Sequence, residues 1–123
     1  MKEIKTNRAP AAIGPYSQAV IVGNMVFTSG QIPVNPETGE IPEGAAAQAK
    51  RVFENIKNLL DAAGTSINNV VKTTVFIQNM EDFAKINEIY QEYFTQPYPA
   101  RSCVEVAKLP KGVLIEVEAI AEI

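Results

Sequence analysis

Two charged residues stand among β-branched and apolar side chains near the C-terminal end of the sequence. Arg101 opens the segment 101–106, and Glu116 lies between Ile115 and Val117. An unpaired charge in such surroundings is costly, so each of the two needs a partner. The planar guanidinium of arginine matches a carboxylate through two parallel hydrogen bonds, so a small organic acid is one candidate partner for Arg101. A structural ion pair with a C-terminal glutamate is the alternative, and the spacing alone leaves both open.

The residue types that the chain lacks restrict its chemistry. There is no histidine, and Cys103 is the only cysteine. A Ser-His or Cys-His nucleophile, a paired-histidine ribonuclease mechanism and a histidine-ligated zinc or iron site are therefore excluded. A lone thiol on a strand is more simply a small buried residue than a nucleophile without a base. Any reaction must use Arg, Glu, Tyr, Ser, backbone groups and water.

The composition indicates one small domain, residues 1–123, that needs no disulfide or metal to fold. Lys and Arg number 11 against 14 Asp and Glu, and this net charge of −3 gives no broad attraction to nucleic acid or to anionic membranes. The charged N-terminus does not resemble a signal peptide, and no stretch has membrane-spanning length. We expect a cytoplasmic protein.

The hydrophobic pattern predicts an α+β fold. Gly23-Asn24 joins two β-rich runs as a tight hairpin, apolar residues at helical spacing predict a helix over 45–63 that stops at Gly64, and 70–77 is a β-branched strand. A second helix begins after Asn79, and 99–106 with 113–121 reads as a C-terminal hairpin. The polar side of the first helix is expected to be solvated surface: Lys50, Arg51, Glu54, Lys57 and Asp61.

Both helices are expected on one face of a single sheet. Yet the segments 70–77 and 113–121 carry large apolar residues at both odd and even positions, whereas a sheet covered on one side should alternate. No segment remains to cover the second face. We therefore expect an oligomer packed sheet to sheet, with pockets at the subunit boundaries.

Three further positions are candidates for a site. Tyr16 lies in a rigid Gly-Pro loop and is either a packed ring bonded to backbone or part of a pocket. Gly30 marks a point where another group could approach the backbone closely. Asn87 shares a helix face with Phe83 and Tyr90, where its amide either caps a backbone group or reaches a pocket.

Several blocks of the chain match one known family. The sequence resembles the RidA family of enamine/imine deaminases, also called YjgF-type or endoribonuclease L-PSP proteins. The resemblance covers nearly the whole chain, and its most specific part is Pro-Ala-Arg-Ser at 99–102 with the downstream Glu116. The matching blocks are 9–19, 28–33, 71–76, 99–106, 109–111 and 116–121.

The resemblance implies a chorismate-mutase-like fold and a homotrimer with a central β-barrel, outer helices and clefts between subunits. It implies hydrolysis of 2-iminopropanoate and 2-iminobutanoate, or their enamine tautomers, to 2-oxo acids and ammonia. These imines are released by pyridoxal-phosphate-dependent dehydratases. No metal or organic cofactor is required, and the small imine or 2-oxo acid is the expected partner.

Position by position, the resemblance places Arg101 on the substrate carboxylate and Glu116 on the attacking water. It also places Tyr16, Ser29 and Asn87 around the pocket, with backbone groups of Gly30 and Cys103 orienting the reacting nitrogen. Two other functions stay open: an endoribonuclease that inhibits translation, and a non-catalytic regulator that binds 2-oxo acids. The first is disfavoured by the missing histidines, the acidic balance and the lack of an aromatic and basic stripe.

Overall fold

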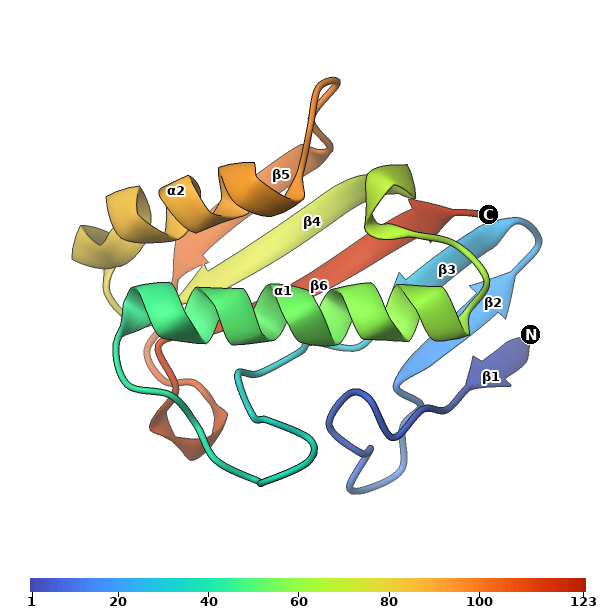
Figure 1. The fold of residues 1–123 in the computed structure, drawn as a ribbon, viewed down its shortest axis with the longest axis horizontal. Coiled ribbons are helices and arrows are strands. Elements are labelled where there is room, and N and C mark those ends of the chain that lie inside the picture. Colours follow the sequence, from blue (N-terminus) through green and yellow to red (C-terminus); the bar gives the residue numbers. More distant parts are fainter.

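The computed structural model describes residues 1–123 and contains one six-stranded sheet in the order β1-β2-β3-β6-β4-β5 (Figure 1). The strands are β1 (Lys2–Ile4), β2 (Ala19–Val22), β3 (Met25–Thr28), β4 (Val70–Ile77), β5 (Ala100–Glu105) and β6 (Ile115–Glu122). The helices are α1 (Ala45–Ala62) and α2 (Phe83–Tyr93). Neither helix combines the length and the apolarity needed to cross a membrane.

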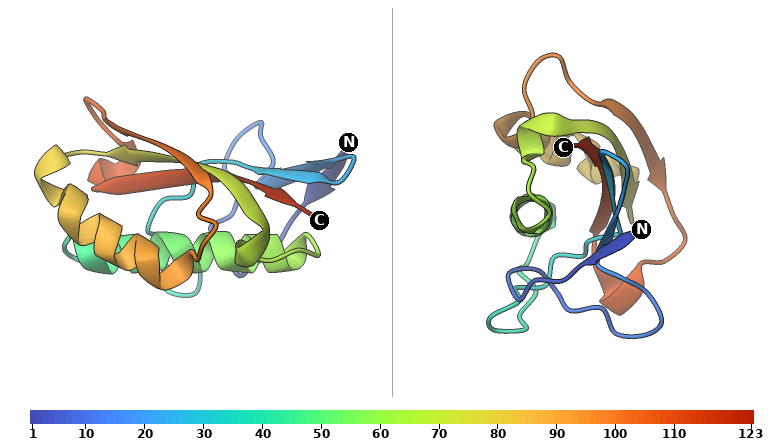
Figure 2. Two further views of the ribbon diagram at one scale, coloured as in Figure 1. Left: turned by 90° about the horizontal axis from the view of Figure 1, so that it is seen from above. Right: turned by 90° about the vertical axis from the view of Figure 1, so that its right-hand side faces the viewer.

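Both helices cover the same face of the sheet, as the sequence predicts (Figure 2). The apolar stripe of α1, including Phe53, Ile56 and Leu60, is completely buried against the strands and against α2. The helix stops where Gly64 adopts the left-handed conformation, with φ of 87°, which a glycine reaches without steric cost. Asn79 accepts a hydrogen bond from the Glu81 N–H (2.9 Å) and caps a short 3₁₀ turn that leads into α2.

The predicted hairpin around Gly23-Asn24 is confirmed, with Val22 opposite Met25. The predicted C-terminal hairpin is wrong, because β4 lies between β5 and β6. Strand β5 pairs with β4 in parallel, and α2 makes the crossover that a parallel pair requires. Strand β6 pairs with the other edge of β4, in antiparallel orientation. Strands β5 and β6 therefore follow one another in sequence but are not neighbours in the sheet.

The second face of the sheet is uncovered within one chain (Figure 2). Phe27 is 40% exposed on this face and pairs laterally with Ile120, while Val104 is 44% exposed and pairs with Phe76. Phe76 and Ile120 belong to the even-numbered half of the doubly apolar pattern, and Phe27 and Val104 extend that surface onto the neighbouring strands. A monomer would leave this apolar surface in water, which is unusual for a folded chain without a partner.

Candidate active site

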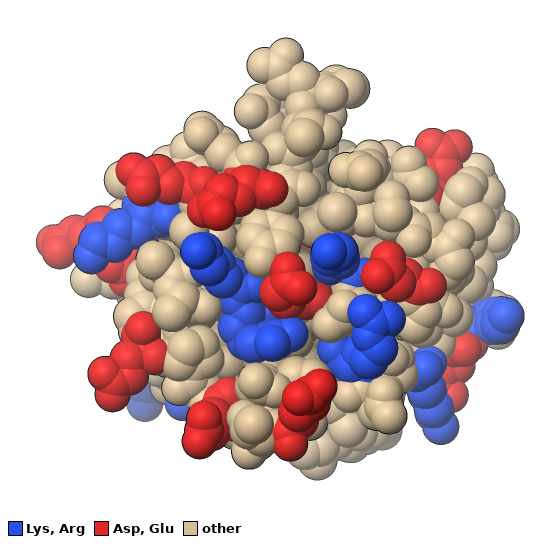
Figure 3. Space-filling model, viewed as in Figure 1, with Lys and Arg blue, Asp and Glu red and all other residues tan.

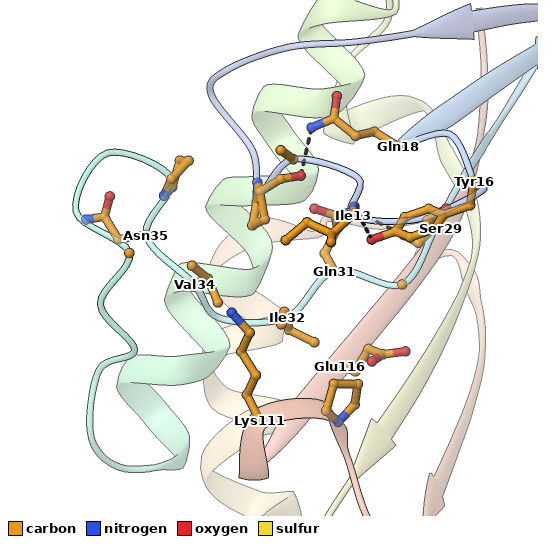
Figure 4. Close-up of a pocket in the computed structure, with 16 residues that line it drawn as sticks. Ile13, Tyr16, Gln18, Ser29, Gln31, Ile32, Val34, Asn35, Lys111 and Glu116 are labelled. Atoms are coloured by element: carbon orange, nitrogen blue, oxygen red, sulfur yellow. Dashed lines mark hydrogen bonds between the residues drawn. The ribbon is translucent and has the colours of Figure 1, made fainter.

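A cavity of about 560 Å³ opens where β3 ends and β6 begins, and we call it the Glu116 pocket (Figure 4). It contains four of the residues predicted to form a site, namely Tyr16, Ser29, Gly30 and Glu116. The rest of its lining comes from the loops 10–18 and 31–39 and from the turn at Pro110 and Lys111.

Glu116 and Gly30 lie close together in this pocket. A β-carbon added to Gly30 would overlap the Glu116 carboxylate, lying 2.8 Å from its Cδ and 3.1 Å from its Cγ. The predicted close approach at Gly30 is thus confirmed. Gln31 exchanges two backbone hydrogen bonds with Val117 (2.8 and 3.1 Å) and holds this segment against β6. Gly30 lines the pocket, and its N–H and C=O have no hydrogen-bond partner in the chain.

The environment of Glu116 favours its protonated form. Burial raises the pKa of this carboxyl above its ordinary value, and the nearby Glu118 raises it further. Both effects disfavour the negative charge. A carboxylate with a raised pKa is a better proton acceptor near neutral pH than an ordinary glutamate.

Ser29 and Tyr16 present different hydrogen-bonding groups to the pocket. The Ser29 hydroxyl donates to the Ser17 carbonyl (2.6 Å), so its oxygen is left as an acceptor. The Tyr16 hydroxyl accepts from the Ile13 N–H (3.3 Å), which leaves its own proton available (Figure 4). Both interpretations of Tyr16 therefore hold: it is bonded to backbone, and it lines the pocket.

Arg101 lies on the opposite side of the sheet, beside α2. Its guanidinium stacks over the rings of Tyr90 (4.8 Å to the centroid) and Phe83 (5.3 Å), and its Nη1 donates to Asn87 Oδ1 (2.7 Å). The Tyr90 hydroxyl is itself bonded to buried Thr73 (2.8 Å), which fixes the ring beneath the guanidinium. The cavity that Arg101 and Asn87 line measures about 360 Å³, and we call it the Arg101 pocket.

These contacts bear on one of the two partners considered for Arg101. No ion pair joins Arg101 to a glutamate, so the structural alternative is not found in this chain. Asn87 accepts a hydrogen bond from one of the five N–H groups of the guanidinium and thereby orients it. The Asn87 amide therefore reaches this pocket and positions Arg101. The other donors of Arg101 remain for a ligand.

Cys103 follows two residues after Arg101 and points to the same face of the sheet. Its side chain is half-buried against the core, and it lines neither of the two pockets. Burial raises the pKa of this thiol, and the positive charge of Arg101 opposes that shift only in part. A protonated thiol is a poor nucleophile, which agrees with the interpretation of Cys103 as a packing residue.

One chain does not bring Arg101 and Glu116 together. On the central strand β4, Arg101 is registered with Thr73 and Glu116 with Phe76, three residues apart. Successive residues of a strand face opposite sides, so the two side chains lie on opposite faces. The predicted site residues therefore lie in two separate pockets of one chain.

The sequence did not indicate the buried amides that hold the pocket walls. Gln18 is 4% exposed, accepts from the Thr6 N–H (2.8 Å) and donates to the Pro10 carbonyl (2.8 Å), which ties down the loop before Tyr16. Glutamine is ordinarily a surface residue. The role of Gln18 in holding this loop is identified only by its partners Thr6 and Pro10, which are distant from it in sequence.

We predict that Gly30→Ala lowers kcat/KM for the substrate between about tenfold and a hundredfold, because the new methyl displaces the Glu116 carboxylate and a small misplacement of a reacting group is costly. The fold should tolerate the change, since the overlapping atoms end a flexible side chain. Steady-state kinetics and a thermal melt test this. An unchanged kcat/KM in a folded variant would show that the position of Glu116 is irrelevant.

Comparison with known proteins places the chain in a family. The family model described as endoribonuclease L-PSP matches residues 6–123. The Escherichia coli K12 protein named 2-iminobutanoate/2-iminopropanoate deaminase is 57% identical over 123 residues, covering 98% of this chain and 96% of that protein.

Solved structures agree over the same length. RidA from the Antarctic bacterium Psychrobacter is 52% identical with a TM-score of 0.97, and the match covers all of both chains. Escherichia coli TdcF, solved with bound serine, is 54% identical with a TM-score of 0.95, covering 100% of this chain and 99% of that one. With a family model over nearly its whole length and a relative at 57% identity, the chain belongs to the endoribonuclease L-PSP family, the RidA-type proteins that its motifs resemble.

Proposed function

We propose that the protein hydrolyses small 2-imino acids, 2-iminobutanoate and 2-iminopropanoate or their enamine tautomers, to 2-oxo acids and ammonia. The observation that carries this proposal is the Glu116 pocket, where a carboxylate with a raised pKa lies against the unpaired backbone of Gly30. The name of the Escherichia coli relative supplies the substrate class.

The complete site requires more than one chain. We infer that residues 1–123 act as one domain in a chorismate-mutase-like homotrimer, whose sheets pack by their uncovered faces into a central barrel. The exposed Phe27 and Val104 support this packing. A cleft at each subunit boundary then joins the Arg101 pocket of one chain to the Glu116 pocket of its neighbour, since neither half completes a site alone.

The geometry supports a short reaction sequence. Arg101, held by Asn87 and the ring of Tyr90, binds the substrate carboxylate through its free donors. Glu116 takes a proton from water as the water oxygen bonds to the imine carbon, whose π electrons move to nitrogen. Glu116 returns that proton to the nitrogen, which gives a tetrahedral carbinolamine. A proton then passes from the new hydroxyl group to the nitrogen through Glu116, the C=O bond forms as the C–N bond breaks, and ammonia and the 2-oxo acid leave. Ser29 Oγ and the Gly30 carbonyl accept N–H groups of the substrate, while the Tyr16 hydroxyl and the Gly30 N–H can donate to an oxygen.

The face that carries both helices has no feature of an RNA-binding surface (Figure 3). On the face that carries both helices, positive and negative side chains are interspersed and form no continuous basic stripe (Figure 3). A basic patch is the electrostatic footprint that nucleic-acid binders require. We therefore do not include ribonuclease activity in the proposed function, although the family description names an endoribonuclease.

The direct test adds purified protein to a serine or threonine dehydratase reaction in which semicarbazide competes for the released imine. Faster release of the 2-oxo acid and ammonia is expected, with less semicarbazone formed. No acceleration by the wild-type protein would overturn the proposal. If 2-oxo acids still bound to the inactive protein, the function would be that of a non-catalytic regulator.

A further inference from the structure

We propose that Asn55 is a positioning residue that fixes the width of the Glu116 pocket and so sets the largest substrate side chain that the site accepts. The inference rests on the proposed function, because it concerns the substrates of the same site. It begins from a loop that forms one wall of the pocket. Six residues of this loop, 31–39, line the cavity: Gln31, Ile32, Val34, Asn35, Pro36 and Gly39.

This wall has space on both of its sides. Asn35 lines the Glu116 pocket and also a second cavity of about 340 Å³ that contains Arg51. The tip of the loop is closed on itself, with Asn35 N–H bonded to the Glu40 carbonyl (2.8 Å) and Gly39 N–H bonded to the Asn35 carbonyl (2.8 Å). At Asn35 the loop therefore has a cavity on each side, while Gln31 fixes only the beginning of the loop through its backbone bonds to Val117.

Asn55, in the middle of α1, supplies the missing constraint. Its side chain is completely buried, and Nδ2 donates to the carbonyls of Ile32 (3.1 Å) and Val34 (3.0 Å). Its Oδ1 accepts from Arg51 Nε (3.1 Å), one helical turn earlier. A guanidinium can only donate, so Arg51 fixes which end of the amide faces the loop.

A buried amide on an apolar helix face is costly unless its hydrogen bonds are made. Here Val52 and Ile56 flank Asn55 in the core of α1, and only the loop carbonyls use its two donors. The same bonds hold the backbone that carries Ile32 and Val34 at a set distance from Glu116. A wall held in place in this way limits the size of the substrate side chain that fits beside Glu116.

The test is Asn55→Asp, which keeps the shape of the side chain and the acceptor for Arg51. It replaces the two donors by an oxygen that repels the loop carbonyls. Asn69→Asp, an exposed change of the same charge, is the matched control. Activity is compared between two small substrates, the imines of alanine and 2-aminobutanoate, and two large ones, the imines of leucine and phenylalanine. An amino-acid oxidase generates all four imines in the assay.

We expect the ratio of kcat/KM for large over small imines to rise by about tenfold in Asn55→Asp, the lower end of what one misfitted methylene changes in an apolar pocket. The change should lie in KM, since Arg101 and Glu116 are untouched. Amide hydrogen exchange over residues 31–36 should be faster than in the wild type. Asn69→Asp should match the wild type in both measurements.

An unchanged ratio in the folded Asn55→Asp variant would overturn the inference. If the Asn55→Asp variant does not fold, Arg51→Ala is the second test, because losing Arg51 frees the Asn55 amide to rotate. Arg51→Ala should raise the same ratio, and an unchanged ratio would overturn the inference. A wild-type protein without activity on any of these imines would instead overturn the proposed function.

Discussion

Replacing Arg101 by alanine is expected to lower kcat/KM for 2-iminobutanoate by roughly 10²-fold or more. A charge-assisted, two-pronged bond to the substrate carboxylate contributes about 3 kcal/mol, and each 1.4 kcal/mol or so is tenfold in rate. Stability should change little, because stacking of a cation on a ring at an exposed site contributes only about 0.5–1 kcal/mol. Steady-state kinetics with a thermal melt separate the two effects.

Arg101→Lys should fail nearly as badly as Arg101→Ala. A lysine keeps the charge but cannot form the planar fork, and it loses the contact geometry with Asn87 and Tyr90. Arg8→Lys is the matched control, since Arg8 is an exposed arginine that bonds Asn58 and approaches Asp61 outside both pockets. Full activity in the Arg101→Lys variant would contradict the role of Arg101 as a carboxylate clamp.

Glu116→Gln is expected to lower kcat between about 10²- and 10⁴-fold, the usual contribution of a positioned general base. The amide fills the same space but cannot take a proton from water. Substrate binding should persist, because the carboxylate clamp is on a different strand. Single-turnover kinetics and binding of a 2-oxo acid measure the two properties, and a glutamine variant with wild-type kcat would exclude Glu116 as the base.

The pH dependence follows from the direction of the shift at Glu116. A base must be deprotonated, so activity should rise with pH through a pKa above that of an ordinary glutamate. Because the pKa is raised by folding, the stabilising contribution of Glu116 is complete below its unfolded pKa and is lost as the pH rises through the folded one. Glu116→Gln should therefore be at least as stable as the wild type at neutral pH.

Glu118→Gln provides the control for this pH profile. Glu118 is the second cause of the raised pKa at Glu116, and its own side chain is exposed. Removing its charge should move the acidic limb of the activity profile to lower pH and leave the plateau unchanged. An acidic limb that does not move would show that another group controls the profile.

The local elements of this fold could be predicted from the sequence, because local pattern determines them. Helical spacing with a terminal Gly64 defined α1, and Gly23-Asn24 defined the β2–β3 hairpin. Gly30 was also predicted as a point of close approach. Each of these features depends on residues that are near one another in the chain or on a single backbone preference.

Strand pairing and the division of the site could not be predicted in this way. Alternation identifies β5 and β6 as strands but does not say that β4 lies between them. The faces of Arg101 and Glu116 depend on their register with Thr73 and Phe76 of that strand. Arg51 was expected to be plain solvated surface, and its bond to Asn55 depends on a tertiary contact of α1 with the loop at Ile32.

We propose that one site is built from Arg101 of one chain and Glu116 of another. The most direct measurement mixes equal amounts of the Arg101→Ala and Glu116→Ala chains, unfolds them together and refolds them. Random assembly gives each cleft two intact partners about one time in four, so about a quarter of the wild-type activity should return. Each variant refolded alone is the control. If the mixture is no more active than the controls, the two residues do not share a cleft between chains, and the proposed arrangement is contradicted.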